Sequence, residues 1–160
     1  MTAVDTVAAK TDTIQDTIVI TNYADNDIVI LQTLNEDFTF DMRYATDNNF
    51  LNEVVYDCDN CALRYKAAKA LMEANDYFLE LGYRIRLFDC CRPVSVQKKM
   101  WEIMPDARYV ANPYTTGSVH NKGLAVDLTL ENMEGEMLDM GTDFDHFGRE
   151  AHVNYTDLSE

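Results

Sequence analysis

Residues 61–88 read CALRYKAAKALMEANDYFLELGYRIRLF, and they carry the clearest helix pattern of the chain. Its apolar residues recur at intervals of three and four, which is the spacing of one face of a helix. They are Leu63, Ala67, Ala70, Leu71, Ala74, Phe78 and Leu81. Gly82 follows at the position of a left-handed C-terminal cap. The pattern predicts a helix over about residues 61–81 and then a short strand over Tyr83–Phe88.

The sequence before this helix predicts strands. Thr17–Thr21 (TIVIT) and Ile28–Leu31 (IVIL) are rich in β-branched residues and are separated by a turn-rich spacer, which is typical of two paired strands. Apolar and polar residues alternate in FTFDMR, so a third strand is expected over 38–43. Residues 1 to about 16 are polar and without periodicity, which is typical of a mobile lead-in. We therefore assign residues 1–36 to an N-terminal extension that is partly mobile and contains strands.

The sequence after residue 88 predicts a second helix and more sheet. Pro93 suits the first turn of a helix that continues to Met104, because the first N–H of a helix has no intrahelical partner, and Pro105 ends it. Alternation returns over 124–130, and the core face of this strand is expected to carry Leu124, Val126, Leu128 and Leu130. Met137–Gly141 is assigned to a returning strand. Strands, two main helices and then strands imply an α+β fold with a mostly antiparallel sheet.

Composition and charge limit the class of partner. The chain has 160 residues and a mass of 18.3 kDa, which is enough for one compact domain. Its 28 acidic and 13 basic residues give a net charge of -15, which repels nucleic-acid phosphates and anionic lipid headgroups. No apolar run approaches the roughly 18 residues of a membrane-spanning helix, and the first residues lack a signal-peptide pattern. We therefore expect no nucleic-acid partner and no membrane insertion.

The four cysteines form one C-x-x-C pair, Cys58 and Cys61, and one adjacent pair, Cys90 and Cys91. A zinc ribbon is disfavoured because it needs two C-x-x-C knuckles, and neighbouring cysteines do not readily face one metal. Two alternatives remain: buried free thiols, or one disulfide that joins the 58/61 region to the 90/91 region. A disulfide would imply an oxidising compartment.

The segment Gly117–Asp127 (GSVHNKGLAVD) concentrates groups that bind metal ions. His120 lies in a predicted loop, Gly123 lets the backbone turn, and Asp127 follows on the non-core face of the next strand. Nitrogen and oxygen donors can thus reach one point, and zinc accepts that donor set. The structural alternative is an exposed loop histidine and an aspartate on a solvated strand face.

Four short motifs follow one another between Asp41 and the end of the chain. They are DMRYATDNNF (41–50), FDCCRP (88–93), S-x-H-x-x-G-x-A-x-D (118–127) and MGTDFD (140–145). In sequence and order they resemble motifs of the D-alanyl-D-alanine dipeptidases, which are zinc D,D-dipeptidases of cell-wall turnover and vancomycin resistance. The resemblance implies that residues 37–160 form a zinc D,D-peptidase-like catalytic domain.

The resemblance implies a role for five side chains. His120 and Asp127 match two of the three zinc ligands, and Arg92 matches the arginine that stabilises the transition state. A guanidinium suits this role because its fixed N–H groups can donate to a developing oxyanion. Ser118 matches the serine that holds the substrate carboxylate, and Asp145 matches the acid near the substrate ammonium. Asp89 could orient Arg92 through a bidentate pair. The structural alternatives are a surface or ion-paired Arg92 and an Asp145 that belongs to a solvated acidic face.

One family motif is missing. The resemblance implies that the third zinc ligand and the general base come from a later E-x-x-H, but no glutamate in these 160 residues is followed three positions later by histidine. We consider three explanations. The chain is a C-terminally truncated form of an active enzyme, which is our expectation; or His146 or His152 supplies the ligand; or the domain only binds.

The sequence thus supports two functions. The first is zinc-dependent hydrolysis of D-Ala-D-Ala or a similar short D,D-dipeptide in cell-wall metabolism, with Zn²⁺ as cofactor and the dipeptide as partner. The second is a non-catalytic domain on the same fold that binds a small ligand or a wall peptide. The cysteines favour a periplasmic or other extracytoplasmic location, with the cytoplasm as the alternative, because the resemblance implies relatives in either compartment.

Overall fold

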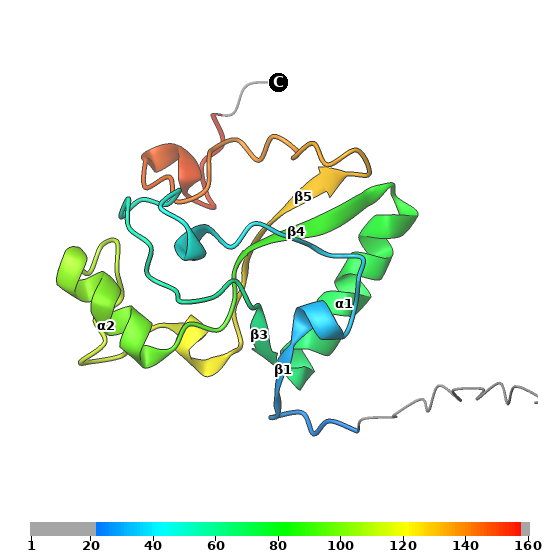
Figure 1. Cartoon of the computed structure of the whole chain (residues 1–160). Helices are drawn as coiled ribbons and strands as arrows, with labels where there is room; N and C mark the ends of the chain where they lie inside the picture. The colour runs from blue at the N-terminus through cyan, green and yellow to red at the C-terminus, as the bar shows by residue number, and fades with distance from the viewer. Residues whose placement is uncertain (1–21, 158–160) are drawn as a thin grey trace, which may run out of the picture.

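A computed structural model describes residues 22–157 and shows an α+β fold (Figure 1). In chain order, its strands and helices are β1 (Ile28–Ile30), β2 (Thr39–Phe40), β3 (Ala62–Arg64), α1 (Tyr65–Glu80), β4 (Tyr83–Asp89), α2 (Val94–Ile103) and β5 (Asp127–Asn132). The predicted fold class and the two main helices are therefore confirmed. In this part of the chain, neither helix is long and apolar enough to cross a bilayer.

The strands form two small sheets. One contains β2, β4 and β5 in that order, with β2 parallel and β5 antiparallel to the central β4. The other pairs β1 with β3 in antiparallel orientation. Antiparallel pairing therefore predominates, as expected. Figure 1 shows β4 and β5 side by side through the centre of the molecule, with α1 and α2 on opposite sides of them.

Helix α1 packs its apolar face on β4. Ala68 and Leu71 are buried with Ile85 and Leu87 in one apolar cluster. Asn75 is also fully buried, and its side-chain oxygen accepts a hydrogen bond from the backbone N–H of Ile85 at 2.7 Å. This bond satisfies a donor at the start of β4 and fixes the helix against the strand.

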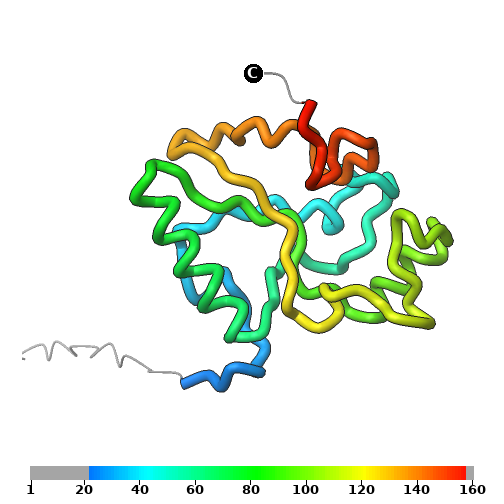
Figure 2. The backbone as a smooth tube through the Cα atoms, turned by 180° about the vertical axis from the view of Figure 1, so that it is seen from behind, coloured from blue at the N-terminus to red at the C-terminus, as the bar shows by residue number. Residues whose placement is uncertain are grey.

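A second apolar cluster forms beside α2. It consists of Tyr44, Leu51, Val55, Met100 and Val110. The ring of Phe144 lies 6.1 Å from that of Tyr44, and Phe147 lies 5.1 Å from Phe50. Figure 2 shows the same neighbourhood from behind, with the segment after residue 140 beside the chain around residue 50. The second cluster therefore joins three parts of the chain that are distant in sequence, around residues 44–55, 100–110 and 144–147.

The predicted start of the first helix is wrong. Residues 62–64 form β3, whereas the sequence pattern places them in the first turn of the helix. Leu63 would be buried either in a helix or in a strand, so its apolar character does not distinguish the two. The strand β3 forms because Leu63 pairs with Val29 of β1. β1 therefore pairs with β3, and the predicted partner Thr17–Thr21 lies outside the described residues.

Three other expected strands differ in extent. The strand expected over 38–43 is reduced to β2, because the chain turns into a single 3-10 turn at Arg43–Ala45. Met137–Gly141 forms only an isolated bridge to Glu131 instead of a returning strand. The strand expected over 124–130 begins later, at Asp127.

The predicted core face over 124–130 is confirmed for Val126 and Leu130, which pack against the first apolar cluster, but not for its two other leucines. Leu124 and Leu128 are 45% and 38% exposed, whereas Thr129 and Glu131 on the opposite face are 5% and 0% exposed. Arg84 on β4 forms a 2.6 Å ion pair with Glu131, so cross-strand ion pairing buries the polar face. β5 is the edge of its sheet, and this position leaves part of its apolar face uncovered among the described residues.

Candidate metal centre and substrate site

A β-bulge brings two carboxylates together at the end of β4. Leu87 pairs with Leu128, but the next pair along the ladder is Asp89 with Asp127, so Phe88 is the extra residue. Bulges locally redirect side chains and are common beside active sites. Asp89 and Asp127 consequently face each other from neighbouring strands.

The loop before β5 presents His120. Ser118 begins a single 3-10 turn, Val119–Lys122, and its hydroxyl oxygen accepts the backbone N–H of His120 at 3.3 Å. The Asn121 side chain accepts the backbone N–H of Ser118 at 2.8 Å, which completes a reciprocal cap. Gly123 ends the turn at φ 65°, in the left-handed region that glycine tolerates best. The local sequence therefore fixes the backbone of His120.

A hydrogen bond to the backbone fixes the orientation of the His120 imidazole. Its Nδ1 lies 2.9 Å from the Cys90 carbonyl oxygen, which can only accept, so Nδ1 carries a hydrogen. Its Nε2 lies 3.5 Å from a carboxylate oxygen of Asp127. The donor atoms of His120, Asp127 and Asp89 all lie within 4.8 Å of one another. The structure thus brings together the two side chains predicted as metal ligands and presents Nε2 to the carboxylate.

Asp89 is buried, and its hydrogen bonds occupy both carboxylate oxygens. One oxygen accepts the Tyr56 hydroxyl at 2.6 Å and the Cys90 N–H at 2.9 Å. The other accepts the Arg92 guanidinium at 2.5 Å and lies 3.3 Å from Nδ1 of His120. Because these bonds already use its lone pairs, Asp89 is better suited to orient Arg92 and His120 than to bind a metal. The expected ion pair between Asp89 and Arg92 is present, but it is formed by one nitrogen–oxygen contact instead of two.

Arg92 is nearly buried and is held from three sides. Besides Asp89, its guanidinium donates to the side-chain oxygen of Gln97 at 3.1 Å and lies 5.0 Å from the centre of the Tyr44 ring. Burial lowers the pKa of Arg92, but the charge of Asp89 opposes it and keeps the pKa above its ordinary value. Arg92 therefore stays cationic. The alternative of an exposed surface arginine is wrong.

Tyr44, Tyr56 and Gln97 are functional candidates that the sequence interpretation missed. Tyr44 lies inside the first quoted motif, DMRYATDNNF, so a signal was present. Gln97 is fully buried on α2, and its amide nitrogen donates to the Ala111 carbonyl at 2.7 Å. Gln97 lies five residues after Arg92, and no local sequence pattern indicates that the two side chains interact.

Asp145 and Ser118 each contact a member of this group. The Tyr44 hydroxyl donates to Asp145 at 2.9 Å and so links Asp145 to the ring beneath Arg92. Burial raises the pKa of Asp145 to about 6, and the nearby carboxylates reinforce the shift, although the hydrogen bond from Tyr44 opposes it. Asp145 also lines an open cavity of about 890 Å³. The Ser118 hydroxyl accepts from the backbone, so its own hydrogen can be donated to a ligand.

The electrostatics of the group favour a cation. Burial lowers the pKa of His120, but the hydrogen bond and charge of Asp127, and the charge of Asp89, outweigh burial and hold the pKa above its ordinary value. One neutral imidazole nitrogen and one carboxylate that are directed at the same position form a ligand set that suits a divalent transition metal. His120 and Asp127 therefore fit the metal that the sequence pattern predicts.

Comparison with known proteins agrees with this geometry. A sequence profile of peptidase family M15, described as D-ala-D-ala dipeptidase, matches residues 24–160. The chain belongs to this D-ala-D-ala dipeptidase family. A D-alanyl-D-alanine dipeptidase of Escherichia coli K12 is 32% identical over 127 residues, which cover 79% of this chain and 65% of that protein.

Two enterococcal relatives are similar as well. A D-alanyl-D-alanine dipeptidase of Enterococcus faecium is 27% identical over 71% of this chain and 66% of its own length. One of Enterococcus faecalis is 28% identical over 80% of this chain and 73% of its own length. The chain thus spans about two thirds of the length of these dipeptidases.

Neither of the other histidines completes the site of this family member. His146 lies 3.2 Å from Glu150, and His152 is exposed. Within residues 22–157, the one group of three metal-ligating side chains is Asp89, His120 and Asp127. The explanation that His146 or His152 supplies the third ligand therefore has no support in this structure.

Proposed function

We propose that this chain carries the metal-binding and dipeptide-positioning part of a zinc D,D-dipeptidase that hydrolyses D-Ala-D-Ala or a similar short D,D-dipeptide in cell-wall metabolism. The supporting observation is the approach of His120 Nε2 to the Asp127 carboxylate, with the cationic Arg92 fixed beside them through Asp89. Membership of the D-ala-D-ala dipeptidase family supports the same function.

His120 and Asp127 would hold the Zn²⁺ ion. When bound, zinc polarises the scissile carbonyl and makes water more acidic. A catalytic zinc site keeps three protein ligands, and these 160 residues contain no E-x-x-H. We therefore propose that turnover needs a third ligand and a general base from outside these residues.

The chain's own side chains would bind and orient the dipeptide. Arg92 would donate to the oxygen that becomes negative during attack, and its fixed position means that little reorganisation is needed. The Ser118 hydroxyl would donate to the substrate carboxylate. Asp145, with a pKa of about 6, is mainly ionised at neutral pH and would pair with the substrate ammonium. Recognition of both termini would exclude longer peptides.

Metal and ligand titrations test this proposal. Calorimetry should show one zinc ion bound per chain, and zinc binding should be lost in both His120→Ala and Asp127→Ala. His152→Ala is the matched control, because His152 is exposed and lies outside the group. Unchanged zinc binding in the first two variants would reject the metal site. With zinc present, D-Ala-D-Ala should bind and L-Ala-L-Ala should not.

The absence of E-x-x-H from these residues also supports the second candidate, a non-catalytic dipeptide-binding domain. A hydrolysis assay separates the two. If a form extended by an E-x-x-H segment cleaves D-Ala-D-Ala and the 160-residue chain does not, the enzyme is supported. Binding without cleavage by both forms supports the binding domain, and cleavage by the 160-residue chain itself contradicts the need for the segment.

We also propose an oxidising location, such as the periplasm. The support is a disulfide between Cys61 and Cys90, which agrees with one of the two alternatives for the cysteines. Disulfides persist mainly in oxidising compartments. Mass spectrometry of the protein alkylated directly in its source cells tests this: labelling of all four cysteines would contradict the proposal.

A further inference from the structure

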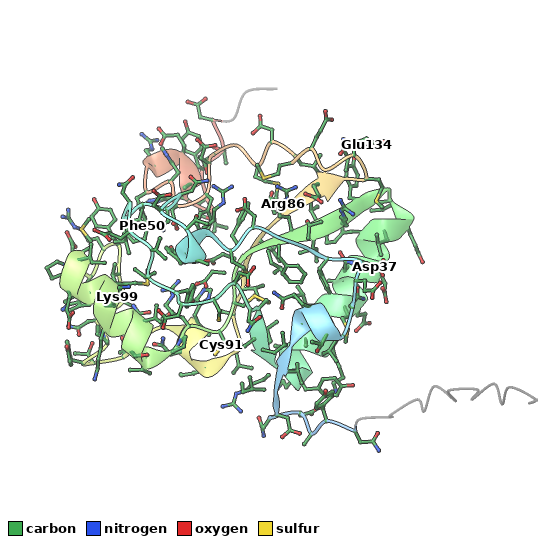
Figure 3. All side chains as sticks on the ribbon, in the orientation of Figure 1. Asp37, Phe50, Arg86, Cys91, Lys99 and Glu134 are labelled. Atoms are coloured by element: carbon green, nitrogen blue, oxygen red, sulfur yellow. A yellow bond between two sulfur atoms is a disulfide. The ribbon has the colours of Figure 1, made fainter. Side chains whose placement is uncertain are left out.

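The Cys61–Cys90 disulfide lies in the first apolar cluster and adjoins the candidate metal centre. It joins positions 29 residues apart, from the residue before β3 to the residue after β4. Cys61 and Cys90 are 0% and 1% exposed. In Figure 3, the neighbouring Cys91 lies where the end of β4 meets the loop that carries His120. The cross-link therefore fixes the backbone at the point where the site is built.

Cys90 contacts the site through its backbone. Its carbonyl oxygen is the acceptor for Nδ1 of His120 at 2.9 Å, and its N–H donates to the Asp89 carboxylate at 2.9 Å. The next N–H, that of Cys91, donates to the Ala62 carbonyl at 2.9 Å. Two adjacent links, one covalent and one a hydrogen bond, thus hold residues 90–91 against residues 61–62.

The position of this carbonyl decides which nitrogen of His120 is available. While the Cys90 carbonyl accepts from Nδ1, Nε2 is the nitrogen that faces Asp127. Groups that accept the second N–H of a metal-binding histidine set its ring orientation and tautomer, and their loss typically lowers metal affinity 10–100-fold. The disulfide fixes the residue that performs this task.

We propose that the Cys61–Cys90 disulfide is a positioning element for His120, so that the metal affinity of the site depends on the oxidation state of this pair. The inference rests on the metal site of the proposed function. Reduction breaks the S–S bond and forms two thiols with the uptake of two electrons and two protons. In the test, a water-soluble phosphine supplies the two electrons and becomes a phosphine oxide, and one water molecule supplies its oxygen and the two protons.

The two remaining cysteines allow a matched background. Cys58 is exposed and Cys91 is half-buried, and both are free thiols. Burial raises the pKa of the Cys91 thiol, so it is mostly protonated at neutral pH. In Cys58→Ala/Cys91→Ala the disulfide is the only sulfur pair left, and thiol exchange cannot rearrange it. Removing these two side chains should leave zinc affinity within about twofold of the wild type.

Zinc affinity is then measured in this background by competition with a chromophoric chelator. Phosphine reduction, or the further change Cys61→Ala/Cys90→Ala, should weaken zinc binding by at least about tenfold. Cys61→Val/Cys90→Ala retains more of the buried volume and replaces the alanine pair if that variant does not fold. Affinity within twofold of the oxidised background, in protein that keeps its circular dichroism, overturns the proposal.

A second readout does not depend on zinc. Nitrogen–proton correlation spectra of the metal-free protein at alkaline pH should show the Nδ1–H tautomer of His120 when the disulfide is intact, and an average of both tautomers when it is absent. His146 and His152 serve as internal references, because both are exposed and His146 faces Glu150. An unchanged His120 spectrum would assign the disulfide a purely stabilising role. If the oxidised background binds no zinc, the proposed function fails, and these spectra still decide the positioning role.

Discussion

Replacement of Glu131 by glutamine tests the polar face of the central sheet. The Glu131 side chain is fully buried and accepts from Thr39 at 2.9 Å, from Arg84 at 2.6 Å and from Arg86. Figure 3 shows Arg86 near β5, whereas Glu134 lies at the turn that follows this strand. Glu131→Gln keeps the shape of the side chain and removes its charge.

The size of the effect follows from burial. Removing one partner of a buried ion pair costs roughly 3–5 kcal/mol. The Arg84 and Arg86 side chains retain 26% and 23% exposure, so water can solvate them after the charge is lost, and the low end applies. We expect the free energy of unfolding to fall by about 3 kcal/mol at pH 7, which corresponds to a Tm decrease of roughly 6–12 °C.

The pH dependence has a defined sign. Burial raises the pKa of Glu131, but the hydrogen bonds from Arg84, Thr39 and Arg86 outweigh it and hold the pKa below its ordinary value. The stabilisation is therefore complete above the pKa of the unfolded chain, about 4.3, and is lost as the pH falls through the lower folded pKa. Wild type and Glu131→Gln should become equally stable in acid.

Urea unfolding followed by far-UV circular dichroism measures both effects. Glu134→Gln is the control, because Glu134 is exposed, and it should change the free energy by less than about 0.5 kcal/mol. A Glu131→Gln protein as stable as this control at neutral pH would refute the reasoning. So would a stability difference that persists unchanged in acid.

Three further variants test the core, the loop and the arginine. Leu87→Ala empties a fully buried position and should cost about 2–5 kcal/mol of unfolding free energy in the same urea assay. Gly123→Ala should cost about 1–2 kcal/mol and lower zinc affinity in calorimetry, because the residue has φ 65° and the added Cβ would lie 3.3 Å from the backbone nitrogen of Arg64; an equally stable variant would contradict the loop geometry. Arg92→Lys should leave zinc stoichiometry unchanged but weaken binding of a phosphinate analogue of D-Ala-D-Ala by at least about tenfold, because it loses the planar fork; equal affinity would argue against a role at the oxyanion.

Local patterns predict the parts of the molecule that depend on local chemistry. The spacing in residues 61–88 predicts α1 and β4, because helix periodicity and strand length are properties of neighbouring residues. The short distance from His120 to Asp127 along the chain likewise predicts their approach in space. The roles of Ser118 and Asp145 in dipeptide binding stay predictions.

The rest depends on partners that are distant in sequence. β3 is a strand because Val29 pairs with Leu63, and Glu131 is buried because Arg84 and Arg86 come from another strand. Neither contact leaves a periodic signal, since each is formed by residues more than 30 positions apart. The link between Arg92 and Gln97 spans only five residues, but it depends on how α2 is oriented relative to the end of β4.

The extra residue at Phe88 also determines which side of the sheet performs chemistry. Up to Leu87, the core-facing residues of β4 are Ile85 and Leu87, which lie in the apolar cluster with α1, and Leu130, the β5 partner of Ile85, packs against them. The single-residue step then places Asp89 level with Asp127, on the side that bears Thr129 and Glu131. In a regular strand, Asp89 would share the face of Leu87, which lies two positions before it. The extra residue lets one strand offer a leucine to the core and, two positions later, a carboxylate to the opposite face.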